Sequence, residues 1–281
     1  MSSGKEESDF SQLAADSLPI ITLLTDFGVT DHFVASVKGV ILSTNPRSHL
    51  VDITHDIPSQ DIEAAAFTLL AVYKSFPTGT IHLAVVDPGV GSSRRAIAVR
   101  TRDQYFVGPD NGIFSYIYET EPAHTTVHVT NETFFNHPVS TTFHGRDIFG
   151  PVAAALSKGV SLDSFGPVVT DEMRLSSFQP QRRTTGALEG RILHIDRFGN
   201  CITNVTREAL GNLSRYAVVI NETRITSLRA FYSDELVNGK LFAVWGSAGF
   251  LEICVRNASA AELLNAKCGQ AITIEENDVH L

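Results

Sequence analysis

The chain is poor in cysteine, has no long apolar run, and carries no excess of positive charge. Its three cysteines, Cys201, Cys254 and Cys268, form no CxxC pair. We therefore expect neither a disulfide framework nor a zinc site, and a reducing compartment is favoured. The first 18 residues lack the apolar segment of a secretory signal. No apolar run approaches the ~20 residues that span a bilayer. These absences predict a cytoplasmic protein that is not inserted in a membrane.

The charge balance limits the kind of partner. Asp and Glu number 31 against 22 Lys and Arg, and the formal net charge is -9. Nucleic acids and anionic membranes are bound by basic surfaces, so we expect neither as a partner, whereas a cationic small molecule is compatible with this balance. His32, His55 and His144 show no HxH or HxxxH spacing, so no metal site is expected.

Length and composition indicate a soluble globular protein with two domains. A chain of 281 residues is long for one average domain and short for three, although one large domain is an alternative. Hydrophobic residues make up 43%, which supplies ample core. We expect a disordered polar tail over residues 1–18, an α/β domain over 19–179 and a smaller β domain over 187–281.

Short apolar runs alternate with helical stripes through the first half of the chain. Strands and helices that alternate at this spacing fold into right-handed βαβ units around a mainly parallel sheet. The expected elements are strands at 19–25, 49–54 and 80–87, a helix starting from Thr30 as N-cap, a helix over 61–76, a hairpin of 96–100 with 104–108, and a helix near 147–158.

The pattern changes near residue 180. Residues 178–190 are polar, contain Pro and Gly, and are interpreted as a linker. Short β-rich segments follow, separated by turn residues and with little helix signal, which predicts a small antiparallel β domain. These segments are RILHID, CITNV, YAVVI, LFAVWG, FLEICV and AITIEE.

Aspartates close two of the expected parallel strands. Asp26 follows the first strand and Asp87 follows the third. Ligands of open parallel sheets bind beyond the carboxyl ends of the strands, so both carboxylates are candidate site residues. The alternative is that each one only caps the turn that follows it, TDFG or DPGVG.

Three further clusters have both a functional and a structural interpretation. His144 and Arg146 precede a predicted helix and would be presented at its start; alternatively, Asp147 caps that helix and Arg146 is paired on the surface. IDRFGN (195–200) is by itself an ordinary turn. Glu252 alternates with apolar neighbours, which a position on an edge strand would explain.

Taken in order, these motifs resemble one known family. The chain resembles the adenosine-forming S-adenosyl-L-methionine (SAM) hydrolases, also called SAM hydroxide adenosyltransferases. These are relatives of the fluorinase and chlorinase that attack the same carbon with halide. The resemblance extends over residues 19–276. Its motifs are TDFGVTD (25–31), VDPGVGSSRR (86–95), GPDNG (108–112), FHGRDIFGPVAA (143–154), IDRFGN (195–200) and SAGFLEICVRN (247–257).

The resemblance implies a fold, an assembly and a reaction. The fold would be an α/β N-terminal domain with a mainly parallel sheet, followed by a smaller, all-β, barrel-like C-terminal domain. The assembly would be a homotrimer that binds SAM between the N-terminal domain of one subunit and the C-terminal domain of its neighbour. SAM would be the substrate, with no cofactor, and water would attack ribose C5′ to release adenosine and L-methionine.

The resemblance also implies the site residues. Asp87, Arg94 and His144 would surround the attacking water. The halogenase branch carries tyrosine or a similar residue at the position of Asp87. The resemblance therefore implies that water, and not halide, is the nucleophile in this chain. Asp26 would grip the ribose hydroxyls. The other implied substrate-binding positions are Asp31, Asp196, Phe198, Asn200, Ser247, Glu252 and Val255.

In the implied reaction, methionine leaves readily as a neutral thioether. The difficulty therefore lies in the attacking water and not in the leaving group. A guanidinium holds its proton too tightly to act as a base, so Arg94 would have an electrostatic role. Our hypothesis is that Asp87 takes the proton and His144 orients the water. A site of low dielectric would favour this charge-neutralising step. Three alternatives remain at this point: a halide-dependent SAM halogenase, a non-catalytic SAM or adenosine sensor, and a nucleoside hydrolase that cuts the glycosidic bond.

Overall fold

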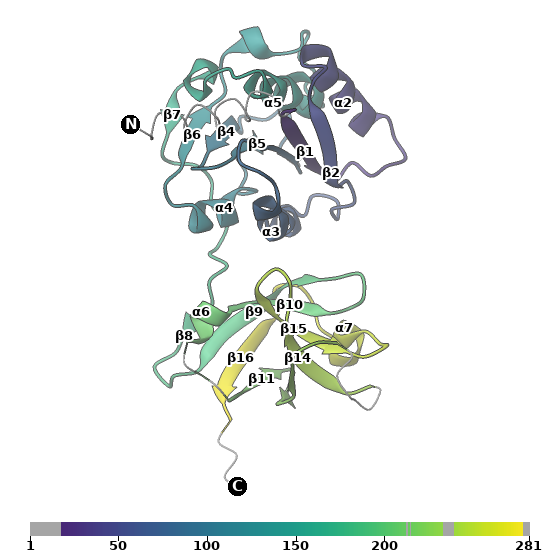
Figure 1. Cartoon of the computed structure of the whole chain (residues 1–281), viewed down its shortest axis with the longest axis vertical. Coiled ribbons are helices and arrows are strands. Elements are labelled where there is room, and N and C mark those ends of the chain that lie inside the picture. Colours follow the sequence, from purple (N-terminus) through teal and green to yellow (C-terminus); the bar gives the residue numbers. More distant parts are fainter. Residues whose placement is uncertain (1–17, 212, 214, 233–238, 278–281) are drawn as a thin grey trace, which may run out of the picture. The chain divides into compact units, whose positions relative to one another are not determined.

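The computed structural model describes residues 18–211, 213, 215–232 and 239–277. The predicted disordered tail therefore lies outside the described residues, apart from Leu18. The chain divides into two compact units, Met1–Leu175 and Ser176–Leu281. Each unit has its own sheet and its own core (Figure 1).

Unit 1 is built on a seven-stranded mixed sheet in the order β2-β1-β3-β5-β4-β6-β7. The first four strands in this order run parallel, and the remaining three add to them in antiparallel fashion. The strands are β1 (Ile20–Thr25), β2 (His49–Thr54), β3 (Ile81–Val85), β4 (Ala96–Arg100), β5 (Tyr105–Pro109), β6 (Thr125–His128) and β7 (Val168–Val169). The predicted hairpin is β4 with β5.

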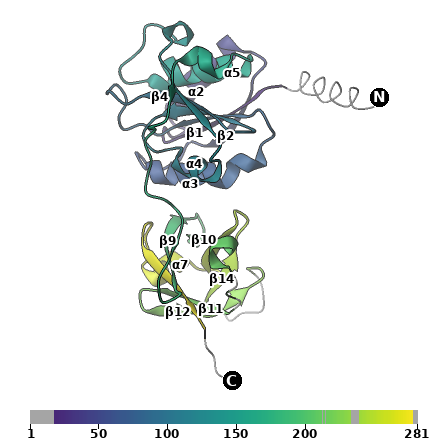
Figure 2. The ribbon, with the colours of Figure 1, turned by 90° about the vertical axis from the view of Figure 1, so that its left-hand side faces the viewer.

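Helices cover both faces of this sheet (Figures 1 and 2). One apolar core lies under α2 and α5, and a second lies under α3 and α4. The helices are α2 (Phe33–Thr44), α3 (Ile62–Val72), α4 (Ser115–Thr120) and α5 (Gly150–Ser157). The shorter helical turns are η1 (Tyr73–Ser75), η2 (Glu132–Phe134), η3 (Gly145–Phe149) and η4 (Leu162–Phe165). Covering helices on both faces explain why the strands are continuous apolar runs, as in β3, where every residue is buried.

Two helix boundaries differ from the prediction. The first helix begins at Phe33 instead of after Thr30, with His32 at the N-cap and no side-chain cap. The chain first turns at Gly28, whose φ is +68° and whose N–H donates to the carbonyl of His55 over 2.8 Å. The second helix ends at Val72, because its last predicted turn is a separate 3-10 turn, η1.

Unit 2 is a nine-stranded sheet that curls into a half-barrel. Its order is β12-β11-β16-β9-β10-β15-β14-β13, with β8 paired to β9. All pairs are antiparallel except β13 with β14. The strands are β8 (Gln181–Arg182), β9 (Leu188–Ile195), β10 (Cys201–Thr206), β11 (Tyr216–Ile220), β12 (Thr223–Ile225), β13 (Leu228–Arg229), β14 (Leu241–Trp245), β15 (Phe250–Val255) and β16 (Ala271–Glu276). Two short helices, α6 (Arg207–Leu210) and α7 (Ala260–Leu264), complete it. The predicted fold class, α/β followed by mainly β, is confirmed.

The interpretation of residues 178–190 as a linker is wrong. This polar segment forms strand β8, which turns back and pairs with the start of β9. The turn contains Gly186, whose φ of +87° suits glycine. Arg182 then donates from Nη2 to the carbonyl of Ala209 over 2.7 Å, which fastens the hairpin to α6. Pro180 thus precedes a strand, and Gly186 marks the turn between two strands.

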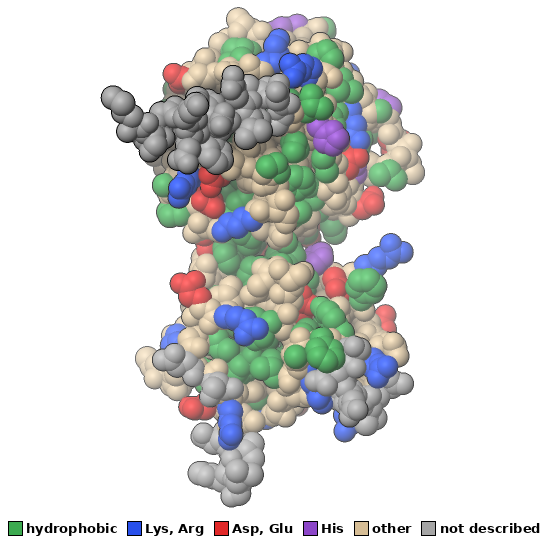
Figure 3. Space-filling view, in the orientation of Figure 1, with side chains coloured by type: hydrophobic (Ala, Val, Ile, Leu, Met, Phe, Trp, Pro, Cys, Tyr) green, Lys and Arg blue, Asp and Glu red, His purple; other side chains and the backbone are tan. Residues whose placement is uncertain are grey.

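Two further observations concern membrane-spanning helices and the distribution of surface charge. Within those residues, no helix combines the length and the apolar character needed to cross a membrane. On the face shown in Figure 3, acidic and basic side chains are interspersed.

Candidate active site

Asp26 and Asp87 lie at the same edge of the sheet in unit 1. Strands β1 and β3 are parallel neighbours, with Thr25 opposite Val85, so the residues that follow them emerge side by side. Both aspartates line a pocket of about 420 Å³, and His144, from a distant part of the sequence, also lines it. The structure thus brings together three of the predicted site residues that are up to 118 positions apart, counted from 26 to 144.

The carboxylate of Asp26 does not cap its own turn. Its Oδ2 accepts from the backbone N–H of Gln60 over 2.9 Å, across 34 residues of sequence. The backbone of Gln60 lies in the left-handed region, with φ of +66°. The turn after β1 is held instead by Thr25, whose hydroxyl accepts from the N–H of Phe27 over 3.3 Å. Asp26 is therefore fixed in place with lone pairs left over for a ligand.

Arg94 links Asp87 to His144. Its Nε donates to Oδ1 and Oδ2 of Asp87 over 2.9 and 3.0 Å, and its Nη2 donates to Oδ2 of the same carboxylate. Nη2 also lies 2.9 Å from Nδ1 of His144. The side chains of Arg94 and Asp87 are only 11% and 5% exposed. Bidentate pairing of this kind holds both side chains of a nearly buried ion pair in a fixed geometry.

The contact with Arg94 assigns the tautomer of His144. A guanidinium donates and never accepts, so Nδ1 of His144 is the acceptor and a neutral imidazole carries its proton on Nε2. Burial lowers the pKa of His144 below its ordinary value, and the positive charge of Arg94 lowers it further. The nearby Asp87 and Asp147 act in the opposite direction but are outweighed. His144 is therefore neutral at pH 7.

His144 is presented by an unusual turn. It lies at the N-cap of η3, a π-helical turn that precedes α5. Turns of this type are rare and are frequently found at functional sites. Gly150 permits the transition to α5, because a Cβ at that position would lie 3.1 Å from the carbonyl oxygen of Gly145.

Asp147 is an internal anchor and not the helix cap that the local pattern suggested. It is fully buried and accepts from Nε of Arg146 (2.7 Å), Nδ2 of Asn136 (3.0 Å) and the N–H of Ser140 (2.9 Å). Burial raises its pKa, but these hydrogen bonds and the charge of Arg146 outweigh burial and lower it. The carboxylate thus stays ionised and ties the 136–140 segment to the turn that carries His144.

Aromatic side chains form one wall of the pocket. Phe27 and Phe143 meet edge to face at 6.0 Å between ring centroids, and Phe33 and Phe143 do so at 5.2 Å. Phe33 is 36% exposed, and Val29, in the loop before it, is 72% exposed. This apolar wall lowers the dielectric around the carboxylates and offers a surface for a flat or apolar ligand.

The sequence analysis missed His55 as a support of the site. His55 follows β2, the third strand end at this edge, and lies 2.8 Å from the hydroxyl of Thr25 through Nδ1. Its Nε2 lies 3.1 Å from Oδ1 of Asp52, which is also paired with Lys38. The rule that ligands bind beyond strand ends would have singled out His55 together with Asp26 and Asp87.

Unit 2 contains a separate pocket of about 780 Å³, and four predicted residues line it: Asp196, Phe198, Asn200 and Val255. Asp196 organises the loop as an ordinary turn would. Its Oδ1 accepts from the N–H of Phe198 (2.9 Å) and of Asn200 (2.8 Å), and its Oδ2 accepts from Nδ2 of Asn200 (2.8 Å). The loop leaves the ring of Phe198 77% exposed beside the pocket.

Glu252 does not occupy an edge strand. Strand β15 lies between β10 and β14, and Glu252 is only 6% exposed. Its Oε2 accepts from the hydroxyl of Tyr232 over 2.6 Å. Burial raises the pKa of Glu252, the hydrogen bond from Tyr232 lowers it, and the charge of Asp196 raises it, with a net rise. Tyr232 lines the pocket and was missed, because no motif surrounds it in the sequence.

The remaining predicted positions lie at the surface. Asp31 is exposed in the loop before α2, and Ser247 is exposed in the turn between β14 and β15. Neither residue lines the pockets described above. Among the described residues, no group of three or more His, Cys, Asp or Glu side chains is arranged to hold a metal ion.

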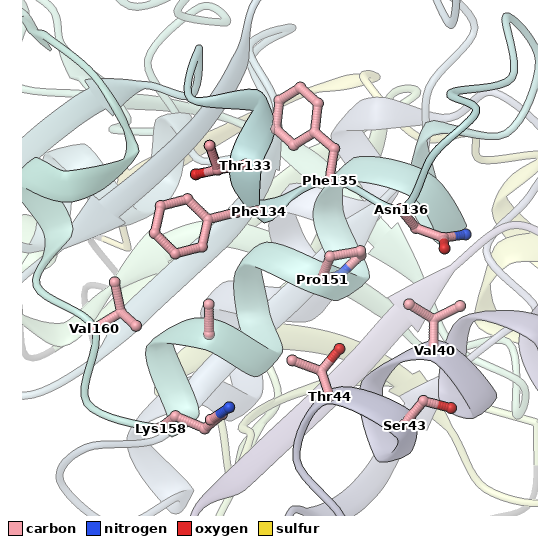
Figure 4. Close-up of a pocket in the computed structure, with 11 residues that line it drawn as sticks. Val40, Ser43, Thr44, Thr133, Phe134, Phe135, Asn136, Pro151, Lys158 and Val160 are labelled. Atoms are coloured by element: carbon pink, nitrogen blue, oxygen red, sulfur yellow. The ribbon is translucent and has the colours of Figure 1, made fainter.

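A second pocket of unit 1, also about 420 Å³, lies between α2, η2 and α5 (Figure 4). Val40, Phe134 and Pro151 give it apolar walls, and Lys158 lies at the end of α5 (Figure 4). It is lined by none of the predicted site residues that the structure describes. Asn136, which lines this pocket, donates to Asp147 in the turn that carries His144.

Comparison with known sequences identifies the family. The SAM hydroxide adenosyltransferase N-terminal domain matches residues 21–166, and the C-terminal domain of the same family matches residues 190–273. The chain belongs to the SAM hydroxide adenosyltransferase family. Both matched ranges carry the residues that line the two pockets described above.

The relatives of this chain include proteins named SAM hydrolase and proteins named fluorinase. The (R)-S-adenosyl-L-methionine hydrolase of Thermus thermophilus is 37% identical to this chain, over 90% of this chain and 98% of its own length. A fluorinase of Actinoplanes sp. is 25% identical, over 93% of this chain and 99% of its own. A crystal structure of an uncharacterized conserved protein from Thermotoga maritima matches with a TM-score of 0.83 and 34% identity, over 90% of this chain and 99% of that chain.

Proposed function

We propose that this protein hydrolyses SAM to adenosine and L-methionine by attack of water at ribose C5′. The observation that carries the proposal is the contact of Asp87, Arg94 and His144 at a pocket that Asp26 also lines. Membership of the family supports it, as does the greater identity to the SAM hydrolase (37%) than to the fluorinase (25%).

At C5′, the proposed step forms one bond and breaks one. A lone pair of the water oxygen attacks C5′, and the C5′–S bond breaks with its electron pair going to sulfur. The sulfonium cation thus becomes the neutral thioether of methionine, and the water proton is transferred to Asp87 and then to solvent. No acid is needed for the leaving group, so the protein must align the water and raise its nucleophilicity.

The hydrogen bonds around Arg94 favour Asp87 as the proton acceptor. A neutral His144 has Nδ1 engaged by Arg94 and a proton on Nε2, so it has no free basic nitrogen. It can instead donate from Nε2 to the oxygen of the attacking water. Arg94 stabilises the negative charge that develops on the water oxygen as its proton is transferred to Asp87, in a setting where low exposure strengthens the interaction.

The substrate is held by residues of both units in this proposal. Asp26 accepts hydrogen bonds from the two ribose hydroxyls, which fixes C5′ for in-line attack. The exposed ring of Phe198 stacks on adenine, and Asn200, Val255 and Asp196 line the same pocket. Asp31, Ser247 and Glu252 complete the set of proposed contacts to the adenine and methionine ends.

The proposed assembly is a homotrimer in which each site takes unit 1 from one subunit and unit 2 from the next. Exposed apolar side chains support burial of these surfaces against another chain: Phe33 and Phe198 at the two pockets, and Val29 in the loop before Phe33. No cofactor takes part in the proposed reaction.

The experiment that tests the function is product analysis after incubation of the purified protein with SAM, with and without chloride or fluoride. Adenosine and methionine in both conditions are the expected products. A 5′-halo-5′-deoxyadenosine would instead identify a halogenase, and free adenine would identify a glycosidic hydrolase. Tight binding of SAM without turnover would identify a sensor.

A further inference from the structure

The GPDNG turn (108–112) begins with the last two residues of β5 and lies against the end of β3. Strand pairing of β3 with β5 ends at Leu83 and Val107, and its pairing with β1 ends at Val85. The carbonyl of Val86, a fully buried residue next to Asp87, is therefore beyond the ladder. Asn111 supplies the donor there, from Nδ2 to the Val86 oxygen over 2.8 Å.

The side chain of Asn111 is itself held rigidly. Its Oδ1 accepts from the N–H of Ile113 over 3.2 Å, and the adjacent Gly112 has φ of +99°, a conformation that favours glycine. A Cβ on Gly108, at the start of the turn, would lie 2.3 Å from the carbonyl oxygen of Ala84. The turn thus packs backbone against backbone on β3, which leaves Asn111 little freedom to move.

The same turn also supports Arg94. Asp110, which precedes Asn111, accepts from Nε of Arg95 over 2.7 Å, and its N–H donates to the carbonyl of Arg95 over 3.0 Å. Asp110 also accepts from the N–H of Met173 over 2.8 Å, which anchors it on the other side. Two successive residues of one turn therefore hold the backbone next to Asp87 and the backbone next to Arg94.

We infer that Asn111 is a positioning residue for the reaction, which sets the place of the Asp87 carboxylate through the carbonyl of Val86. The inference rests on the proposed hydrolysis. Asp87 has to face the attacking water while both of its oxygens are bound to Arg94, so a small shift of its backbone misaligns the water. A displacement of about 1 Å at a catalytic group can lower a rate by roughly 100-fold.

Asn131 offers a matched control in the same unit. Its Nδ2 donates to a distant carbonyl, that of Ser164, over 2.9 Å, and its Oδ1 accepts from the N–H of Thr133 over 3.2 Å. Both asparagines are half-buried. Asn131 thus makes the same two kinds of bond as Asn111, but it lines neither the pocket of Asp87 nor that of Phe198.

The test compares Asn111→Ala with Asn131→Ala in full-length protein, by kcat and KM for SAM, SAM affinity by calorimetry, and melting temperature. We expect Asn111→Ala to lower kcat at least about tenfold while KM and affinity change less than about twofold, because Asp87 acts on the water and not on adenosine. Asn131→Ala should keep kcat within about twofold at a similar melting temperature. If Asn111→Ala does not fold, Asn111→Ser, which keeps an acceptor for Ile113, replaces it.

The inference is overturned if Asn111→Ala keeps its kcat, or if both variants lose kcat in proportion to lost stability. Failure of the proposed function is distinguished by the wild-type protein, which would then form no adenosine. In that case the proposed role of Asn111 is overturned as well.

Discussion

His144 accepts on Nδ1 a hydrogen bond from Nη2 of Arg94, over 2.9 Å. Because Arg94 also donates to both carboxylate oxygens of Asp87, one guanidinium fixes the orientation of both the imidazole and the carboxylate. The imidazole is left with a donor facing outward and the carboxylate with free lone pairs. This asymmetry separates the role of Asp87 from that of His144.

The first prediction concerns these two roles. Asp87→Asn should lower kcat by about 100-fold or more, because it removes the proton acceptor, and His144→Ala should lower it less, because it removes only an orienting donor. Steady-state assays of adenosine release measure both. Full activity in Asp87→Asn together with loss in His144→Ala would mean that the roles are reversed.

The second prediction concerns acid stability and His82. This fully buried side chain is held between Thr22 (2.8 Å) and Gln104 (3.2 Å), and burial lowers its pKa to about 4, with Gln104 opposing the shift. An unfolded chain binds a proton at this histidine below pH ~6.5, whereas the folded protein does not until about pH 4. The free energy of unfolding should therefore fall by about 3 kcal/mol as pH falls through this window, and this contribution should be constant above it.

Denaturant titrations at several pH values would measure this slope. His82→Leu should be less stable at neutral pH yet show a shallower loss between pH 6.5 and 4. His49→Asn, at an exposed position of β2, serves as the control and should keep the wild-type slope. An unchanged slope in His82→Leu would contradict this assignment.

The third prediction concerns Asp147. Asp147→Leu should lower the free energy of unfolding by about 3 kcal/mol or more, because Arg146, Asn136 and the N–H of Ser140 would lose their buried acceptor. Chemical denaturation measures the loss. Asp171→Leu is the comparison: its carboxylate pairs with Arg95 but is 78% exposed, so its loss should cost far less stability than the loss of Asp147. Equal costs would mean that burial of Asp147 does not contribute as proposed.

The fourth prediction concerns assembly. Asp87→Asn disables unit 1 and Asp196→Ala disables the loop of unit 2, so neither variant alone should be active. Co-expressed as mixed trimers, they should regain about a quarter of wild-type activity, because in the proposed trimer each site draws its two units from different subunits and one pairing in four is intact. Co-expression of two differently tagged copies of Asp87→Asn should stay inactive. No recovery in the mixed trimers would place both units of a site in one subunit.

Much of the fold follows from local patterns, and what does not follow depends on contacts distant in sequence. Strand β2 has the bounds that its apolar run predicted. The start of α2 was misjudged because the turn at Gly28 is fixed by the carbonyl of His55, which lies in another loop. The π-helical turn at His144 depends on the buried Asp147 and its partners in 136–140, which no local period reveals.

The candidate site was predictable in parts. Asp26 and Asp87 follow from the rule of strand ends, but the pairing of Asp87 with Arg94 and His144 came from resemblance, because the latter two lie in loops. Glu252 was misread because its partner, Tyr232, is brought to it from a segment without a motif. A buried carboxylate in a central strand is explained only once that partner is known.

The central claim, attack of water at C5′, is tested most directly with ¹⁸O-labelled water. The purified protein would be incubated with SAM in labelled and in ordinary water, and the products analysed by mass spectrometry. The account predicts adenosine with one ¹⁸O at the 5′ position and unlabelled methionine. Unlabelled adenosine, or intact bound SAM with no adenosine, would contradict it.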